Sequence, residues 1–252
     1  MKKQQIVSIT STVGLAITTM LSAHAAVAQE VATQGTSGTP SPMLTAQLSA
    51  RVGFVPPAED GAPRHTRGGA TRDPSCDAVQ VLPEGARGLT VSARPVIPAY
   101  FQAGVKQVWL KIEAVDGSEE YSYELDRYFA LPEGKGFAEV PLPDSVGELT
   151  LNKQYVWSLV LICNNPLGPS SPVVKGSIRR VPTSWETAEI EQMSFLEKAE
   201  LYGKEGLWYD FIYALNQVRM SAPNNMQAAY DWETALSTQA LDFALDEQLT
   251  EQ

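Results

Sequence analysis

Few residues of this chain could act as nucleophiles or as transition-metal ligands. The cysteines are Cys76 and Cys163, and beyond the first 28 residues the only histidine is His65. A Ser-His-Asp or Cys-His relay needs a histidine held beside the nucleophile, and a histidine-based zinc site needs more than one histidine. We therefore expect no such relay, no metal site and no cofactor.

Acidic side chains are the remaining candidates for catalysis, and they crowd one predicted hairpin. Paired carboxylates could serve a glycosidase or hold calcium. Glu124 and Asp126, however, alternate with Tyr123 and Leu125, as the wet face of a half-buried strand does. We interpret the set as a solvated face. Its members are Glu113, Glu119, Glu120, Glu124 and Asp126.

Trp208, Tyr209 and Asp210 form a second candidate group, at the start of a predicted helix. A tryptophan beside a tyrosine can stack on a sugar or on a partner's side chain, and an aspartate in the first turn suits the helix dipole. In the structural alternative, Trp208 packs the helices on the preceding domain and Asp210 caps its helix. We favour the structural interpretation and retain the three residues as candidates for ligand or partner binding.

A basic, glycine-rich run before Cys76 is the third candidate. Consecutive backbone N–H groups at Gly68 and Gly69, flanked by Arg67 and Arg72, could form an anion-binding nest. Alternatively, these arginines dock on the acidic surface of the same protein, since arginine pairs readily with carboxylates. We favour the second interpretation.

The first 28 residues have the pattern of a signal peptide. Lys2 and Lys3 precede an uncharged stretch, residues 6–23, and the cleavage site would follow Ala28. An uncleaved anchor is the competing interpretation, but serines and threonines dilute an apolar run that falls short of the ~20 apolar residues a span prefers. We expect an exported protein, in the periplasm or outside the cell, with no membrane span once the signal is removed.

The composition of the chain argues against two classes of partner. The formal net charge of −10 would become −12 without Lys2 and Lys3, which makes nucleic acid or an anionic membrane surface a poor partner. Residues 29–74 are rich in Gln, Thr, Ser, Gly and Pro, which predicts a flexible tether. An oxidising compartment favours a disulfide between Cys76 and Cys163, with two buried free thiols as the alternative. The disulfide would remove thiolate catalysis and hold the basic run close to the fold.

Residues 75–182 alternate short apolar runs with turn residues, which predicts an antiparallel β-sandwich, immunoglobulin-like in outline. The stretch 153–163 is the predicted central strand, because apolar residues occupy both of its faces. Pro95 and Pro98 predict that 96–101 is an edge or bulged segment. The other predicted strands are 78–82, 89–93, 108–114, 121–129, 137–142 and 173–181.

Residues 183–252 change to a helical period. Thr183 and Glu186 have the spacing of a capping box, and the residues from Gly203 to Gly206 break the first helix from the second. These two helices resemble one tetratricopeptide-type pair. A single pair cannot bury its own face, so we expect the pair and a third helix to pack on the sandwich. The predicted fold is mainly β with C-terminal helices.

Several motifs together resemble a family of uncharacterised secreted proteins that are common in cyanobacteria and classified only as a domain of unknown function. The resemblance spans about residues 64–232 and implies an exported β-sandwich with appended helices, but no activity. The motifs that carry it are 68–72 before Cys76, 88–95, Tyr155-x-Trp157 before Cys163, 177–181 and Tyr202-x-x-x-Gly206-x-Trp208-Tyr209-Asp210.

The leading hypothesis is a non-enzymatic exported module that binds another envelope or secreted protein. It depends on the predicted sandwich, the helix pair, the tether and the scarcity of catalytic residues. The alternative is a carbohydrate-binding module or a carboxylate-based glycan enzyme. A cleft that joins exposed aromatic side chains to two convergent acids would favour that alternative.

Overall fold

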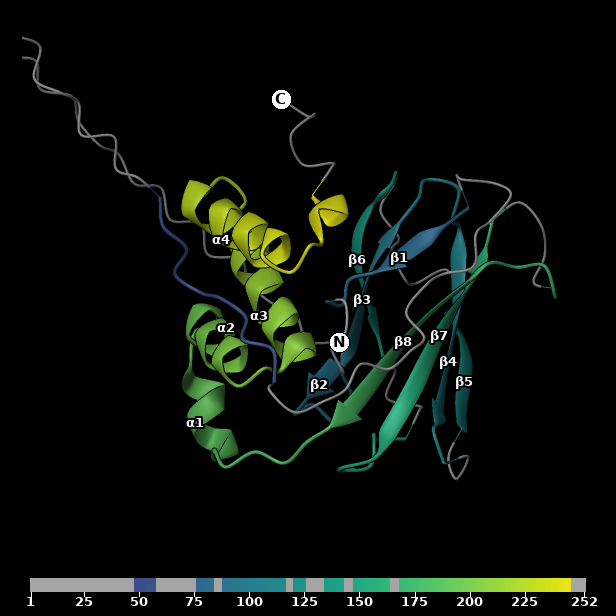
Figure 1. The fold of residues 1–252 in the computed structure, drawn as a ribbon, viewed down its shortest axis with the longest axis horizontal. Coiled ribbons are helices and arrows are strands. Elements are labelled where there is room, and N and C mark those ends of the chain that lie inside the picture. The colour runs from purple at the N-terminus through teal and green to yellow at the C-terminus, as the bar shows by residue number, and fades with distance from the viewer. Residues whose placement is uncertain are drawn as a thin grey trace, which may run out of the picture. The chain divides into compact units, whose positions relative to one another are not determined.

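The computed structural model describes residues 48–57, 76–83, 88–116, 120–125, 134–142, 147–163 and 168–245. All of them belong to the unit formed by Ala46–Gln252. In this described part, eight β-strands precede four α-helices and one short 3₁₀ helix (Figure 1).

The larger sheet has the strand order β2-β8-β7-β4-β5. Its pairs are antiparallel except β2 with β8, which run parallel. The strands are β2 (Gly88–Thr90), β4 (Gln107–Ala114), β5 (Glu120–Leu125), β7 (Gln154–Ile162) and β8 (Val173–Arg180).

Strand β7 is central, as its sequence predicts. Tyr155, Trp157 and Leu159 alternate on its inner face, and all three are fully buried. On the outer face, Val156 and Val160 are only half-buried. The outer face is therefore less buried than the inner face, although apolar residues occupy both.

The smaller sheet has the order β1-β3-β6, with antiparallel pairs. Its strands are β1 (Ala78–Gln80), β3 (Val96–Phe101) and β6 (Gly136–Pro141). The prediction that 96–101 is an edge segment was wrong, because β3 lies between the other two strands. Pro98 has no N–H to donate, but its carbonyl oxygen accepts a bond from the Val81 N–H at 3.1 Å, and so the strand stays paired.

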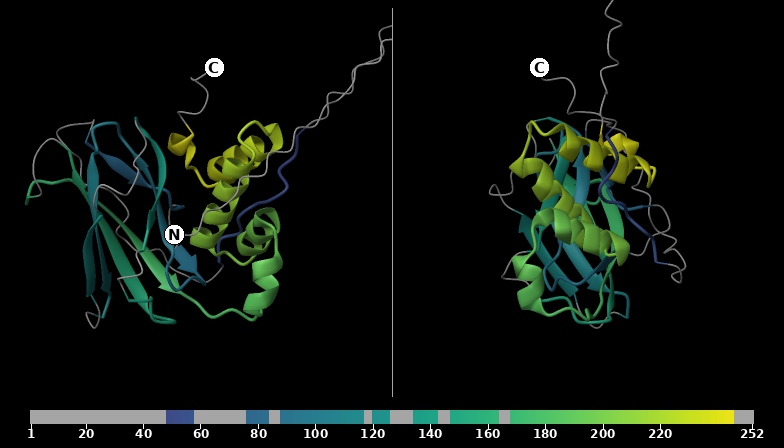
Figure 2. Two further views of the ribbon diagram at one scale, coloured as in Figure 1. Left: turned by 180° about the vertical axis from the view of Figure 1, so that it is seen from behind. Right: turned by 90° about the vertical axis from the view of Figure 1, so that its left-hand side faces the viewer.

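The helices follow the strands and pack on them. Their bounds are α1 (Thr187–Gln192), α2 (Phe195–Lys204), α3 (Trp208–Ser221), α4 (Met226–Ser237) and η1 (Asp242–Ala244). Helix α3 contacts α2 and α4, and it also contacts β2 and β3. Figures 1 and 2 show the helices gathered beside the sheets rather than between them.

The first helix starts differently from the prediction. Thr183 makes no capping box with Glu186; its Oγ1 accepts the N–H of Trp185 at 3.0 Å, and α1 begins without a side-chain cap. The observed capping box belongs to α2, between Ser194 and Glu197. The predicted first helix is divided into α1 and α2, which are separated at Met193 and Ser194. The predicted break at Gly203–Gly206 is confirmed between α2 and α3, with Gly206 at a φ of +70°.

The chain is therefore mixed α/β, with two sheets and a helical layer, rather than mainly β. Side chains from both sheets and from the helices share one hydrophobic core. No helix within the described ranges has both the length and the apolar character needed to cross a membrane.

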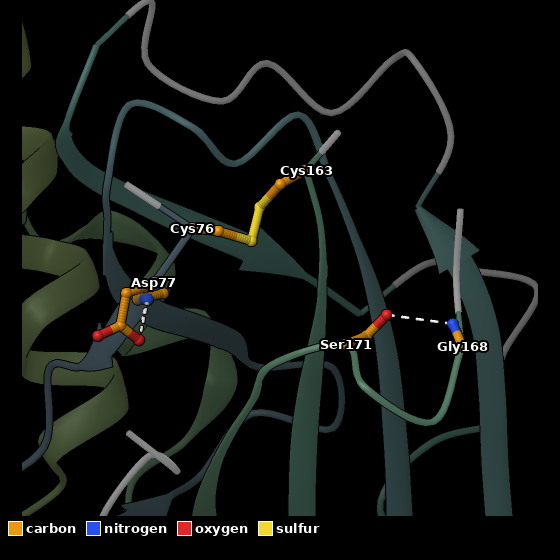
Figure 3. Close-up of a disulfide and its surroundings, with 6 residues drawn as sticks. Cys76, Asp77, Cys163, Gly168 and Ser171 are labelled. Atoms are coloured by element: carbon orange, nitrogen blue, oxygen red, sulfur yellow. Dashed lines mark hydrogen bonds between the residues drawn. A yellow bond between two sulfur atoms is a disulfide. The ribbon is translucent and has the colours of Figure 1, made fainter. Parts of the chain in front are cut away.

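A disulfide joins Cys76 to Cys163, as predicted, with 5.9 Å between the two Cα atoms. Cys76 precedes β1 of the smaller sheet and Cys163 follows β7 of the larger one, so the bond is a covalent link between the sheets (Figure 3). Beside it, Asp77 accepts a bond from the Ala78 N–H at 2.8 Å.

Candidate functional site

The structure describes one of the two groups of residues that were predicted to bind a ligand or partner. Arg67, Gly68, Gly69 and Arg72 lie outside the described residues, so the anion-binding nest stays a prediction. Trp208, Tyr209 and Asp210 form the first turn of α3, and all three side chains are buried. Each of them bonds to a different strand or to its flanking residue.

Trp208 joins α3 to the smaller sheet. Its Nε1 donates to the carbonyl oxygen of Val81, the residue after β1, at 2.7 Å. With residues 48–57 in place the indole ring is fully buried and offers no exposed face to a sugar. Its position agrees with the structural interpretation, in which it packs the helices on the sheets.

Tyr209 joins α3 to the larger sheet. Its hydroxyl accepts a bond from Trp157 Nε1 at 2.6 Å and donates to the carbonyl oxygen of Ser177 at 2.9 Å. A Cβ at Gly88 would collide with the Tyr209 ring, and one at Gly176 would collide with Trp157. The two glycines thus leave room for the aromatic pair, and burial raises the pKa of the Tyr209 hydroxyl well above its usual range.

Asp210 bonds to the residues at the end of β2. Its carboxylate accepts bonds from Thr90 Oγ1 at 3.2 Å and from the Val91 N–H at 3.0 Å. The residue before α3, Leu207, makes no side-chain cap. Burial raises the pKa of Asp210 from 3.8 to about 6, although these two hydrogen bonds lower it.

Tyr209 and Asp210 also line a cavity of about 450 Å³ between the segment after β2 and helices α2 and α3. Aromatic rings dominate the helical wall, and two cationic side chains, Arg94 and Lys198, also line the cavity. The lining residues are Val91, Ser92, Arg94, Pro95, Val96, Phe195, Lys198, Tyr202, Tyr209, Asp210, Tyr213 and Ala214.

Phe195 and Tyr213 are the two exposed aromatic residues of this cavity. They are 40% and 38% exposed, and their rings meet edge to face with 6.4 Å between centroids. The Nζ atom of Lys198 lies 5.4 Å from the centre of the Phe195 ring. A ligand or a partner side chain in this cavity could therefore contact two partly exposed rings and a cation.

Arg94 supplies the second cation of the cavity. Its Nη1 donates to Glu148 Oε1 at 3.1 Å, and both side chains are partly exposed. The lining contains one carboxylate, Asp210. Glycoside hydrolysis normally uses two, so the described lining is better suited to binding than to hydrolysis.

The helical wall of this cavity has a pattern in the sequence that could have predicted it. Phe195, Lys198 and Tyr202 have the spacing i, i+3 and i+7, which places them on one face of a helix. Their link to Val91 and Arg94 could not be inferred, because these residues lie about a hundred positions earlier in the chain. Within the described ranges, no group of three His, Cys, Asp or Glu residues is arranged to hold a metal ion.

Comparison with known proteins gives a family but no individual relative. Neither the curated proteins nor the solved structures contain a match. A family model described as a domain of unknown function, DUF928, matches residues 62–249. The match includes both sheets, the helices and the cavity, and it begins after residues 48–57. The chain belongs to the DUF928 family.

Proposed function

We propose that this chain is an exported, non-enzymatic interaction module of the cell envelope, which binds another envelope or secreted protein at the cavity between the segment after β2 and helices α2 and α3. The signal-peptide pattern of the first 28 residues supports export. The disulfide is compatible with an oxidising compartment. The resemblance to secreted cyanobacterial proteins agrees with the same proposal.

The observation that carries the proposal is the composition of the exposed part of the cavity. Tyrosine and arginine are enriched among residues that dominate binding energy in protein interfaces. Here Tyr213 and Phe195 are partly exposed, and Arg94 and Lys198 line the same cavity. A partner side chain that is aromatic or anionic would fit this combination.

Two buried residues that line the cavity, Tyr209 and Asp210, give it a rigid floor. Tyr209 is held by bonds to Trp157 and Ser177, and Asp210 by bonds to Thr90 and Val91. Preorganised sites bind with a smaller loss of conformational freedom. In this proposal, α2 and α3 are the tetratricopeptide-like element of the module and the sheets are an immunoglobulin-like support.

Site-specific crosslinking in the full-length protein tests the proposal. A photoreactive phenylalanine analogue replaces Tyr213 and, in a control variant, Val115, which is 65% exposed at the end of β4. In envelope extract we expect one discrete crosslinked protein from position 213 and none from position 115. Lys198→Glu should remove that product. The same crosslinked products from both positions, or none from position 213, would count against the proposal.

A carbohydrate-binding module is the second candidate. The observation in its favour is the partly exposed pair Phe195 and Tyr213 next to the carboxyl group of Asp210, because aromatic rings stack on sugars and carboxyl groups bond to hydroxyls. A glycan array probed with the wild-type protein and with Tyr213→Ala tests it. Binding that is lost in Tyr213→Ala would favour this candidate, whereas an array without signal would remove it.

A further inference from the structure

Residues 48–57, which we call the strap, lie across the helical layer. They fall in the stretch whose composition predicts a flexible tether, but Val52 and Phe54 are buried. The strap runs beside α2 in dark blue in Figures 1 and 2. The prediction of a tether therefore does not describe these ten residues.

Side chains at two strap positions enter the helical layer. The Phe54 ring meets Trp208 edge to face at 4.8 Å between centroids and also contacts Phe211 at 5.7 Å. Arg51 bonds to Asp231, which is fully buried: its N–H donates to Oδ1 at 2.9 Å and its Nε to Oδ2 at 2.8 Å. The helical layer thus binds an arginine and, three residues later, an aromatic residue.

The helices also recognise the main chain of the strap. The Val55 N–H donates to the carbonyl oxygen of Gly203 at 3.0 Å, and Gln227 Nε2 donates to the carbonyl oxygen of Ser49 at 2.8 Å. A Cβ at Gly203 would collide with the Gly53 carbonyl oxygen, and one at Gly206 would crowd Pro57. Because these two glycines have no side chain, they leave room for the main chain of an extended peptide.

The groove and its occupant belong to different parts of the chain. Gly203, Gly206, Trp208, Phe211, Gln227 and Asp231, which form the strap groove, all lie within the family match, residues 62–249. The strap precedes that match. The groove residues therefore lie inside the region that matches the family, whereas the strap lies outside it.

We propose that the strap groove is a second binding site, separate from the cavity, for an extended segment of another protein that carries arginine and, three residues later, an aromatic side chain. In this chain the strap occupies the site in cis. Asp231 selects the cation, Trp208 and Phe211 receive the ring, and Gly203 leaves room for the main-chain carbonyl of the residue opposite it, here Gly53. A partner with this pattern competes with the strap.

The test uses the full-length chain and a labelled ten-residue peptide with the sequence of the strap. Arg51→Ala with Phe54→Ala weakens the resident strap, so we expect this variant to bind the peptide at least tenfold more tightly than the wild-type chain in fluorescence anisotropy. Adding Asp231→Asn should abolish binding. The matched control, Val115→Ala with Lys175→Ala on the larger sheet, should bind as the wild type does.

A second arm does not depend on how the variant folds. The wild-type chain, folded first, is cleaved at a protease site inserted between Pro57 and Cys76, and the labelled peptide is then added in excess. Incorporation of the strap peptide, but not of a peptide with glutamate at the Arg51 position, supports the proposal. Equal binding of both peptides or no incorporation overturns it. Dimers held by exchanged straps would assign the groove to a second copy and would overturn the assignment to a different protein.

Discussion

The helical layer is held on two sides by different chemistry. Towards the sheets, Trp208, Tyr209 and Asp210 bond to neutral groups and are buried. Towards the strap, the polar contacts include the ion pair of Asp231 with Arg51, whose side chain is 40% exposed. The sheet side therefore resembles the interior of a domain, and the strap side resembles a protein–peptide interface.

This difference predicts which contacts keep the whole domain folded and which contacts hold only the strap. Contacts on the sheet side cannot be lost without exposing the common core, so their loss should unfold the whole domain. Contacts on the strap side join one segment to the helices, and their loss should release that segment first. The following predictions test this division, from the largest expected effect to the smallest.

Trp208→Ala should lower the free energy of unfolding by about 4 kcal/mol, because it removes a fully buried ring and its bond to Val81. Urea unfolding followed by circular dichroism measures the loss. Phe195→Ala, at a 40% exposed aromatic residue, is the control and should cost less than about 1 kcal/mol. A similar cost for both substitutions would mean that Trp208 does not anchor the layer.

Stability should fall as the pH rises from about 4 to about 7, on the order of 2 kcal/mol for each of two acids, of which one is buried and one partly buried. Burial raises the pKa of Asp210 to about 6, and that of Glu139 from 4.5 to about 7 despite Asn216 and Arg219. Because the folded-state pKa values are raised, the protonated forms favour the folded state, and that contribution disappears as the groups ionise.

Urea midpoints measured between pH 4 and pH 8 check this dependence. Asp210→Asn should flatten the curve, since an amide oxygen can still accept the Val91 bond without a charge. Asp242→Asn, at an exposed position in η1, is the control and should leave the slope unchanged. An unchanged slope in Asp210→Asn would show that Asp210 does not titrate in this range.

Asp231→Ala should release the strap with a cost of about 2 kcal/mol, because Arg51 loses a buried partner. This corresponds to about thirtyfold faster trypsin cleavage after Arg51 when the strap opens and closes rapidly. Glu200→Ala, which breaks the exposed ion pair with Lys204, is the control and should have little effect. Unchanged cleavage in Asp231→Ala would argue against release of the strap.

Gly203→Ala should have the smallest effect on unfolding and still weaken the strap. Alanine favours the end of α2 by up to about 1 kcal/mol, but its Cβ collides with the carbonyl oxygen of Gly53. We expect faster cleavage after Arg51 with nearly unchanged urea unfolding. Gly134→Ala, where a Cβ meets open space, should change neither quantity.

Patterns of short range predicted the elements well. Alternation in 108–114 and apolar residues on both faces of 153–163 predicted two neighbouring strands of the larger sheet, and the break at Gly203–Gly206 predicted the start of α3. Local rules failed where a distant partner decided the outcome. Pro98 lies in a middle strand, where its carbonyl oxygen accepts the N–H of Val81, and no local feature of the sequence predicts that bond.

The candidate site was only partly accessible from sequence. The group at 208–210 was identified, but its role depends on Val81, Thr90 and Ser177, which are far away along the chain. The same is true of the strap, since Arg51 and Asp231 are 180 positions apart. Composition alone made residues 48–57 look like part of a tether, because two buried side chains hardly change it.

The parallel pairing of β2 with β8 has a consequence for the order of folding. Gly88 pairs with Ile178, and Thr90 bonds to Asp210, so β2 gains its contacts only when distant residues are present. Contacts of such high sequence separation slow folding. A chain that crosses a membrane from its amino end would keep β2 unpaired until β8 and α3 had followed. In the proposed export, this protein would complete its fold after translocation. Segments that end before residue 178 should leave β2 without a neighbour.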